Sequence, residues 1–455
     1  MAVSRKCFCF LSALLLFFLF FLSWILISPP SPVPQRFNES TILWRENASD
    51  EFWSQRGEFL ERICGQSRWR EEYAAFHKTK GKHRSSRKLF NVALESGWTD
   101  RLVGSVTSLY WAILTERVFL EVTYGDLPSY SEALYSNWID WEGFASNGIG
   151  EFEGAHFTFH DTRAYKHPEE RERYFYERNA SALAYFMNDE RKSSYFCDKD
   201  LRTIPWLPTE QASSPRLFVT SNRGKTHCLL TNPHTREALQ RMRLNQRSVY
   251  LCGFDFLFQP KQEVVTLARP YLNRLLAYDI RITVSIRVRG DGAFRGVALS
   301  DNEMERITAK FYACARDIET DAIKRAHLIV KERPVTTVWY VMSESSEVKR
   351  YVAKKWQSDR QIVTDNFVPI HPDCHDKNVT TCTKKDMHAS AVVAMAQLFI
   401  ASSSQFHVVT PGSGFGIQAA WLASQDDVNV WMGTSHCTMK NKVSMRALVR
   451  HWAGI

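Results

Sequence analysis

Arg287 is the residue whose type and position point most directly to chemistry. It lies near the carboxyl end of residues 280–288, an alternating, β-branched segment that predicts a strand buried on both faces. A guanidinium is permanently charged and makes forked hydrogen bonds to phosphate. Because a buried strand tolerates such a charge only with a partner, Arg287 either binds an anion or belongs to a structural ion pair. Arg289 and Arg295 follow closely and are further candidates for anion binding.

A glycine turn at residues 411–416 is the second place where chemistry is expected. It stands between a predicted strand at 406–410 and a predicted helix at 417–423. Glycines let a ligand approach the backbone closely, and the free N–H groups of a helix start can bind a diphosphate. A plain connection between strand and helix is the alternative. The candidate contacts are Ser413, whose hydroxyl is a further donor, Gly414, Phe415 and Gly416.

Three carboxylates near predicted turns are candidates for a general base: Asp100, Asp255 and Asp291. In a sugar transfer with inversion, such a base takes the proton of the acceptor hydroxyl as the anomeric bond breaks. Asp100 could instead cap the helix that follows it, and the sequence does not choose among the three. Arg101, next to Asp100, is a further candidate for binding an anion at that helix start.

Two patterns could hold a metal ion, and neither is favoured. Asp198 and Asp200 have the D-x-D spacing of some metal-dependent transferases, but they lie among aromatic residues far from the predicted strand ends of the second half. A zinc site is the other possibility, and its spacing matches no familiar module. Its four ligands would be Cys374, His375, Cys382 and His388. We therefore expect no metal.

The elements that must position these residues follow a β-α-β order. Residues 89–94 and 117–122 predict strands, and residues 101–115 between them have apolar side chains at helical spacing. A strand, a glycine turn, a helix and a second strand favour a parallel sheet.

The second half of the chain alternates more regularly. Strands are predicted at 280–288, 336–342, 361–364 and 406–410, and helices at 303–318, 343–355, 387–401 and 417–423. This alternation predicts a doubly wound, Rossmann-like domain. Ligands of such sheets bind at the carboxyl ends of strands, where both the turn at 287–292 and the turn at 411–416 are expected.

An apolar run at residues 7–28 has no charge and is long enough to cross a bilayer as a helix. Arg5 and Lys6 precede it, and prolines follow it where a cleavage site would stand. A signal anchor is therefore favoured over a cleaved signal peptide. The tail at 1–6 is then cytosolic and the rest of the chain lumenal.

Other features fit a lumenal chain. Of its ten cysteines, Cys7 and Cys9 lie in the predicted anchor, and the other eight can pair in an oxidising compartment. Cys374 with Cys382 is the candidate disulfide. The net charge of +9 indicates either a basic surface or a basic cleft for an anionic donor, and no nucleic acid is expected as a partner. Sequons for N-glycosylation begin at Asn38, Asn47, Asn179 and Asn378.

The length after the anchor exceeds that of one compact core. We expect a stem at 29–60, an N-terminal Rossmann-like domain on the acceptor side at 61–278, and a C-terminal donor-binding Rossmann-like domain at 279–455.

Several short motifs, in order, resemble the plant-type α-1,2-fucosyltransferases, which include xyloglucan and arabinogalactan fucosyltransferases. Residues 99–118 (TDR…YWAILTERV) are similar to the G-N-R…L-Y-A-L-L-T-x-R-V stretch of that family, and 196–207 (FCDKD…IPWL) to its F-C-x-x-D…P-W-L stretch. Residues 286–288 (IRV) match its donor motif, and 409–416 resemble its S-T-F-G turn. Departures at 97–101 (GWTDR), at 288–291 (VRGD) and at 413–416 (SGFG) mark a divergent member.

The resemblance implies an α/β fold of the GT-B type, with two Rossmann-like domains facing a cleft. It implies transfer of fucose from GDP-fucose, with inversion and without a metal cofactor, to a glycan or polysaccharide acceptor in the Golgi lumen. Arg287 would then hold the donor diphosphate, with Arg289 and Arg101 nearby, and residues 413–416 would line the nucleotide pocket. A GT-B enzyme with another nucleotide sugar and a membrane-tethered, catalytically silent glycan-binding protein remain alternatives.

Overall fold

The chain is described here from a computed structural model. The predicted anchor at 7–28 and the first half of the predicted stem lie outside the residues that it describes. Within the described part, no helix combines the length and apolar character needed to cross a bilayer. The described residues are 45–83, 85–93, 97–123, 129–142, 182–186, 216–220, 224, 226–288, 299–329, 333–367, 383–426, 428–433, 436–444 and 447–448.

The first half of the chain forms a parallel sheet with strand order β2-β1-β5-β4. Helix α4 (Trp98–Leu114) packs on β1 and β2, which confirms the predicted β-α-β unit. Nearly all its residues are buried, including polar ones such as Arg101, Ser105 and Ser108. The strands are β1 (Lys88–Ala93), β2 (Val118–Thr123), β4 (Ala182–Phe186) and β5 (Arg216–Thr220).

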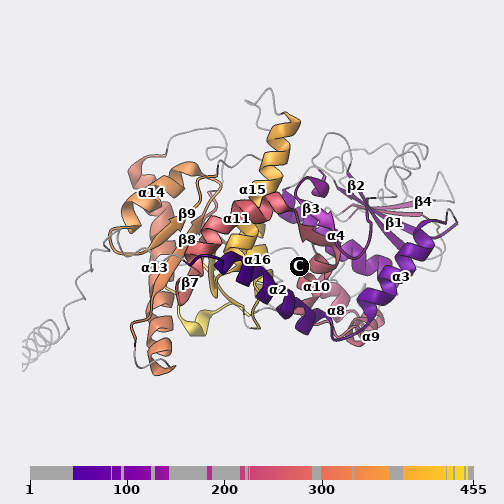
Figure 1. The fold of residues 1–455 in the computed structure, drawn as a ribbon, viewed down its shortest axis with the longest axis horizontal. Helices are drawn as coiled ribbons and strands as arrows, with labels where there is room; N and C mark the ends of the chain where they lie inside the picture. The colour runs from indigo at the N-terminus through magenta and orange to yellow at the C-terminus, as the bar shows by residue number, and fades with distance from the viewer. Residues whose placement is uncertain are drawn as a thin grey trace, which may run out of the picture.

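The second half forms a five-stranded parallel sheet with order β11-β10-β7-β8-β9, so its central strand is the one that leads to Arg287. The predicted mixed α/β fold with parallel sheets is therefore confirmed (Figure 1). The strands are β7 (Ile280–Ser285), β8 (Thr337–Met342), β9 (Ile362–Thr364), β10 (Phe406–Val409) and β11 (Asn429–Met432).

Helices cover both faces of this sheet. Ile282 and Val284 of β7 face α13 (Asp301–Ile329) and α14 (Ser346–Trp356). The alternate side chains of β8 and β10 face the opposite way, where the core is continuous with that of the N-terminal half. That second face is covered by α15 (Lys384–Ser402) and α16 (Gly414–Trp421). The doubly wound arrangement places every strand in a buried layer.

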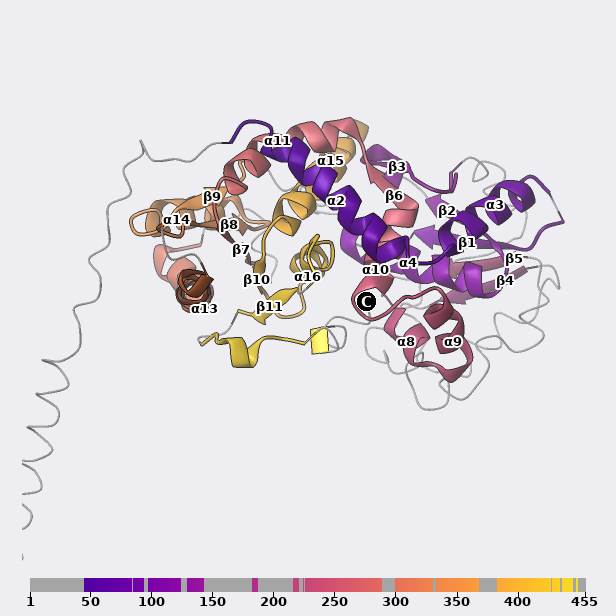
Figure 2. The ribbon, with the colours of Figure 1, turned by 60° about the horizontal axis from the view of Figure 1, so that its bottom comes forward.

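Helix α2 (Ala48–Cys64) lies across the junction of the two halves, from α11 (Gln262–Leu275) to α10 (Ser248–Leu257) (Figure 2). The predicted stem at 29–60 is therefore too long, because its last residues belong to this helix. Phe52, Phe59 and Leu60 recur at helical spacing and are buried, so the segment is amphipathic rather than a free spacer.

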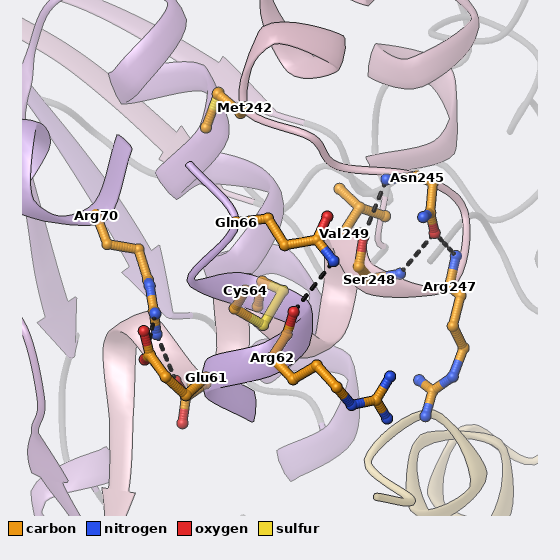
Figure 3. Close-up of a disulfide and its surroundings, with 12 residues drawn as sticks. Glu61, Arg62, Cys64, Gln66, Arg70, Met242, Asn245, Arg247, Ser248 and Val249 are labelled. Carbon is orange, nitrogen blue, oxygen red and sulfur yellow. Dashed lines mark hydrogen bonds and ion pairs between the residues drawn. A yellow bond between two sulfur atoms is a disulfide. The ribbon is translucent and has the colours of Figure 1, made fainter. Parts of the chain in front are cut away.

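Two disulfides whose cysteines both lie in the described part of the chain join elements far apart in the sequence. Cys64 of α2 is bonded to Cys252 of α10 (Figure 3), and Cys314 of α13 to Cys437. The expected cysteine pairing is thus present, but the candidate pair of Cys374 and Cys382 lies outside the described residues.

Smaller elements complete the described fold. Strands β3 (Leu134–Ser136) and β6 (Phe258–Pro260) form an antiparallel pair beside the N-terminal sheet. The remaining helices are α3 (Trp69–Gly81), η2 (Tyr130–Glu132), α8 (Thr226–Thr231), α9 (Pro233–Arg241) and η4 (Met439–Asn441).

Candidate functional site

Arg287 lies at the carboxyl edge of the C-terminal sheet. Strand β7 ends at Ser285, so Arg287 is exposed rather than buried within a strand, and the expectation of a buried charge is wrong. Its backbone N–H donates a hydrogen bond of 2.8 Å to Oγ1 of Thr410, just beyond β10. Among the described residues, no group lies within hydrogen-bond or ion-pair distance of its guanidinium. The described part of the chain therefore offers no support for a structural ion pair.

Glu344 holds the segment that carries Arg287. Its carboxylate follows β8 and accepts a hydrogen bond of 2.6 Å from the backbone N–H of Val288. Burial raises the pKa of Glu344 to about 7, although hydrogen bonds from backbone N–H groups and the charge of Arg287 oppose the shift. Sequence reasoning missed this residue because residues 343–346 read as a helix cap. Its position just after a predicted buried strand could have marked it as a candidate site residue, because ligands of such sheets bind at the carboxyl ends of strands.

The turn after β10 is fixed by Thr410 and Gly412. Oγ1 of Thr410 donates to the carbonyl of Ser285 at 3.0 Å, and the Thr410 N–H donates to the same carbonyl at 3.1 Å. Gly412 has a φ of 71°, a conformation in which a side chain is strained. The turn is therefore rigid at the point where the chain enters α16.

Helix α16 begins at Gly414, earlier than predicted, so Gly414, Phe415 and Gly416 form its first turn. Ser413 occupies the N-cap position, is buried and makes no capping hydrogen bond with its side chain. The residues predicted to contact a donor therefore lie in the first turn of a helix. The backbone N–H groups of such a turn can bind an anion. A Cβ on Gly416 would meet Oγ of Ser285 at 2.6 Å, so this glycine allows α16 to pack against β7.

The start of α4 lies beside α16. Nε2 of Gln418, in α16, donates a hydrogen bond of 2.6 Å to the carbonyl of Thr99 in the first turn of α4. Asp100 belongs to the same turn and is partly exposed; the N-cap is Gly97, so Asp100 is not the cap. Arg101 is buried, with its guanidinium 5.4 Å from the ring centre of Trp98. The two halves of the molecule therefore meet where the start of α4 contacts the middle of α16.

Of the other predicted residues, those that the structure describes lie elsewhere in the fold. Asp255 lies on α10, where its carboxylate is 3.5 Å from Arg70 of α3, and burial raises its pKa. Of the sequon asparagines, Asn47 is exposed directly before α2. Several predictions fall outside the described residues and are not tested by them: Arg289, Asp291, Arg295, Asn38, Asn179, Asn378, Asp198 and Asp200.

His388, the only described member of the zinc set, links the two halves instead. Its Nδ1 lies 2.8 Å from Oε2 of Glu132 in η2, and its Nε2 lies 2.7 Å from Oε2 of Glu263 in α11. The hydrogen bond to Glu132 is the largest cause of a raised pKa at His388, with a second contribution from Glu263.

Taken together, the edge of the C-terminal sheet carries an exposed guanidinium, a rigid turn and a helix start without a side-chain cap. These groups suit a doubly charged anion such as a diphosphate, because guanidinium and helix N–H groups both donate to phosphate oxygens. Asp100 is the carboxylate that the adjoining turn supplies from the other half.

Comparisons with known proteins bear on the fold. No family model matches the chain, and neither does any curated protein sequence. The chain is similar to the structure of an Arabidopsis thaliana FUT1 mutant in complex with GDP, at 15% identity and a TM-score of 0.51. That match covers 92% of this chain and 83% of the other. At this identity, the likeness shows a shared fold.

More distant matches have lower scores. NodZ α-1,6-fucosyltransferase soaked with GDP-fucose is 10% identical, with a TM-score of 0.41, over 78% of this chain and 98% of the other. POFUT1 in complex with GDP-fucose is 9% identical, with a TM-score of 0.34, over 77% of this chain and 99% of the other.

Proposed function

We propose that the chain is a fucosyltransferase that uses GDP-fucose as donor. The observation that carries this proposal is the exposed Arg287 at the carboxyl edge of the C-terminal sheet, beside the start of α16. A nucleotide diphosphate placed there meets both a guanidinium and helix N–H groups. The fold shared with an Arabidopsis protein solved with GDP supports a guanine nucleotide in particular.

The proposed reaction inverts the anomeric carbon of fucose and forms an α-1,2 linkage to a glycan. A base takes the proton of an acceptor hydroxyl, and the acceptor oxygen bonds to the anomeric carbon. At the same time the bond from that carbon to the β-phosphate oxygen breaks. Arg287 and the start of α16 stabilise the charge that develops on the departing GDP. Asp100 is our choice of base, because its turn adjoins α16.

We further propose that residues 7–28 anchor the chain in the Golgi membrane with both α/β halves in the lumen. The uncharged apolar run and the basic residues before it support this topology. The two disulfides suit an oxidising compartment.

A donor screen with the purified full-length protein tests the proposal. We expect release of the nucleotide and transfer of the sugar with GDP-fucose, and neither with UDP-sugars or GDP-mannose. Turnover with another donor and none with GDP-fucose would contradict the proposal and favour a different nucleotide-sugar enzyme. Binding of glycans with no response to any nucleotide would favour a catalytically silent glycan-binding protein.

A further inference from the structure

The carboxyl end of α16 is held by two arginines from the other half of the molecule. Nη1 of Arg247 donates to the carbonyl of Trp421 at 2.7 Å, and its Nη2 donates to the carbonyls of Ala423 and, at 3.1 Å, Gln425. Nη1 of Arg56 donates to the carbonyl of Leu422 and, at 3.0 Å, to Oγ of Ser424. Carbonyls at the end of a helix lack partners within the helix, so these two side chains satisfy them.

Both arginines come from elements that a disulfide joins. Arg56 is in the middle of α2, and Arg247 directly precedes α10. The disulfide between Cys64 and Cys252 ties those two helices together. Figure 3 shows Arg247 extending from the start of α10 toward the pale yellow ribbon of the C-terminal half, on one side of the disulfide. The two guanidiniums therefore reach α16 from α2 and from the start of α10, two helices that a disulfide joins.

The two arginines carry charges that are largely removed from solvent. Arg56 is only 5% exposed, and its guanidinium also lies 5.3 Å from the ring centre of Phe399. Burial lowers the pKa of Arg56 and of Arg247 to about 10, so both remain charged at neutral pH. A buried charge is costly unless it is compensated, and the negative end of a helix dipole together with several carbonyls compensates it here.

The other end of α16 is the candidate donor site. The helix has eight residues, so its two ends are separated by about 12 Å. Gln418 ties its middle to the start of α4, while Gly416 fits its first turn against β7. A shift of its carboxyl end would therefore also move the N–H groups of Gly414 and Phe415 relative to Arg287.

We propose that Arg56 and Arg247 are positioning residues that hold the anion-binding start of α16 in place from the opposite half of the molecule. This inference rests on the proposed function, because it assumes that GDP or GDP-fucose binds at that start. Both arginines contact the carboxyl end of α16, opposite the start where the donor is proposed to bind, so their effect would pass through the helix.

The test compares Arg56→Gln and Arg247→Gln with Arg62→Gln in the full-length protein. Arg62 is a matched control, since it lies on α2 and also reaches the C-terminal half, but through an exposed ion pair of 3.0 Å with Asp426. We expect the dissociation constant of GDP and the KM for GDP-fucose to rise about tenfold or more in the first two variants, because small displacements of binding groups are costly. Arg62→Gln should leave both constants unchanged.

A purely structural role would lower the melting temperature without changing GDP affinity measured well below it, and that result would overturn the inference. Should the glutamine variants fail to fold, Arg56→Lys and Arg247→Lys carry the test. They keep the buried charge but lose the fork of donors, and unchanged GDP affinity in both would also overturn it. If the wild-type protein does not bind GDP, the proposed function itself fails, which is a separate outcome.

Discussion

The carboxyl edge of the C-terminal sheet combines an exposed Arg287 with the largely enclosed carboxyl group of Glu344. The two follow neighbouring parallel strands, β7 and β8. The carboxylate of Glu344 accepts a hydrogen bond from the backbone N–H of Val288, the residue after Arg287. Glu344 thus shapes the backbone that presents Arg287. Its charge state also adds to the field at the proposed diphosphate, because its raised pKa lies near neutrality.

Replacing Glu344 by Gln should make donor binding less dependent on pH. In the wild type, Glu344 loses its proton as the pH rises through about 7, and the new negative charge weakens GDP-fucose binding. We expect the wild-type dissociation constant to rise several-fold from pH 6 to pH 8, while that of Glu344→Gln stays nearly flat. Calorimetric titration across this range measures both. A wild-type affinity that does not fall with pH would contradict the assignment.

Replacing Asp100 by Asn should remove the proposed base. We expect kcat to fall by about 100-fold or more, while GDP affinity stays the same, because general-base catalysis contributes at that level. Asp255→Asn is the comparison, since Asp255 pairs with Arg70 and should affect stability more than turnover. Unchanged kcat in Asp100→Asn would remove Asp100 from the mechanism.

Some candidate residues could be selected from the sequence and others could not. Arg287 and the turn at Ser413 could be selected because their types and their place after strands are local features, and their part in donor binding stays a prediction. The exposure of Arg287 could not be predicted, because it depends on where β7 stops pairing with its neighbouring strands. Arg56 and Glu344 were missed, because their roles arise from contacts with chain segments distant in the sequence.

At the scale of elements, α16 connects the carboxyl edge of the C-terminal sheet to the N-terminal half. It packs on β7 and β10 through Gly416, contacts α4 through Gln418, and is held at its far end by Arg56 and Arg247. Its short length means that these contacts at the two ends fix its direction.

Gly416→Ala should disturb this packing. The added Cβ would lie 2.6 Å from Oγ of Ser285 and 3.0 Å from Cγ1 of Val409, so the helix or strand must move. We expect a loss of about 1–3 kcal/mol in the free energy of unfolding, as for other overpacked cores. GDP affinity should fall as well.

Gly57→Ala is the matched control for this prediction. A Cβ there meets nothing within 4 Å, and Gly57 lies exposed inside α2. Alanine should raise stability by about 0.5–1 kcal/mol, because glycine is costly inside a helix. Denaturant unfolding measures both variants, and equal effects at the two positions would refute the packing role of Gly416.

Elements with strong periodicity were predicted well. The strand at 280–288 and the helix at 387–401 correspond to β7 and α15. The start of α16 was misplaced, because three residues of glycine and phenylalanine carry no periodic signal. The end of the stem was misplaced, because a short apolar stripe at helical spacing does not by itself show that the helix packs on α10 and α11.

At the scale of the whole molecule, the two α/β halves share one continuous core and several polar contacts. The length and the alternation of strands and helices allowed two such halves to be predicted. The manner in which they meet could not be predicted, since it depends on α2 crossing both and on side chains such as His388 bridging them.

The link through His388 should make stability depend on pH. Its pKa is raised by Glu132 and Glu263, so the contact contributes fully below the ordinary histidine pKa and is lost as the pH rises through the raised value. We expect the melting temperature of the wild type to fall, relative to His388→Gln, as the pH rises above about 6.5. A constant difference between the two proteins from pH 5 to pH 9 would contradict this.

The most direct test of the central claim is the titration of the purified full-length protein and its Arg287→Ala variant with GDP. We expect the wild type to bind GDP and the variant to bind about 10- to 100-fold more weakly, because hydrogen bonds to charged groups contribute at that level. Arg241→Ala, at an exposed position on α9, should bind as the wild type does. Equal affinity in the wild type and Arg287→Ala, or no GDP binding by the wild type, would contradict the account.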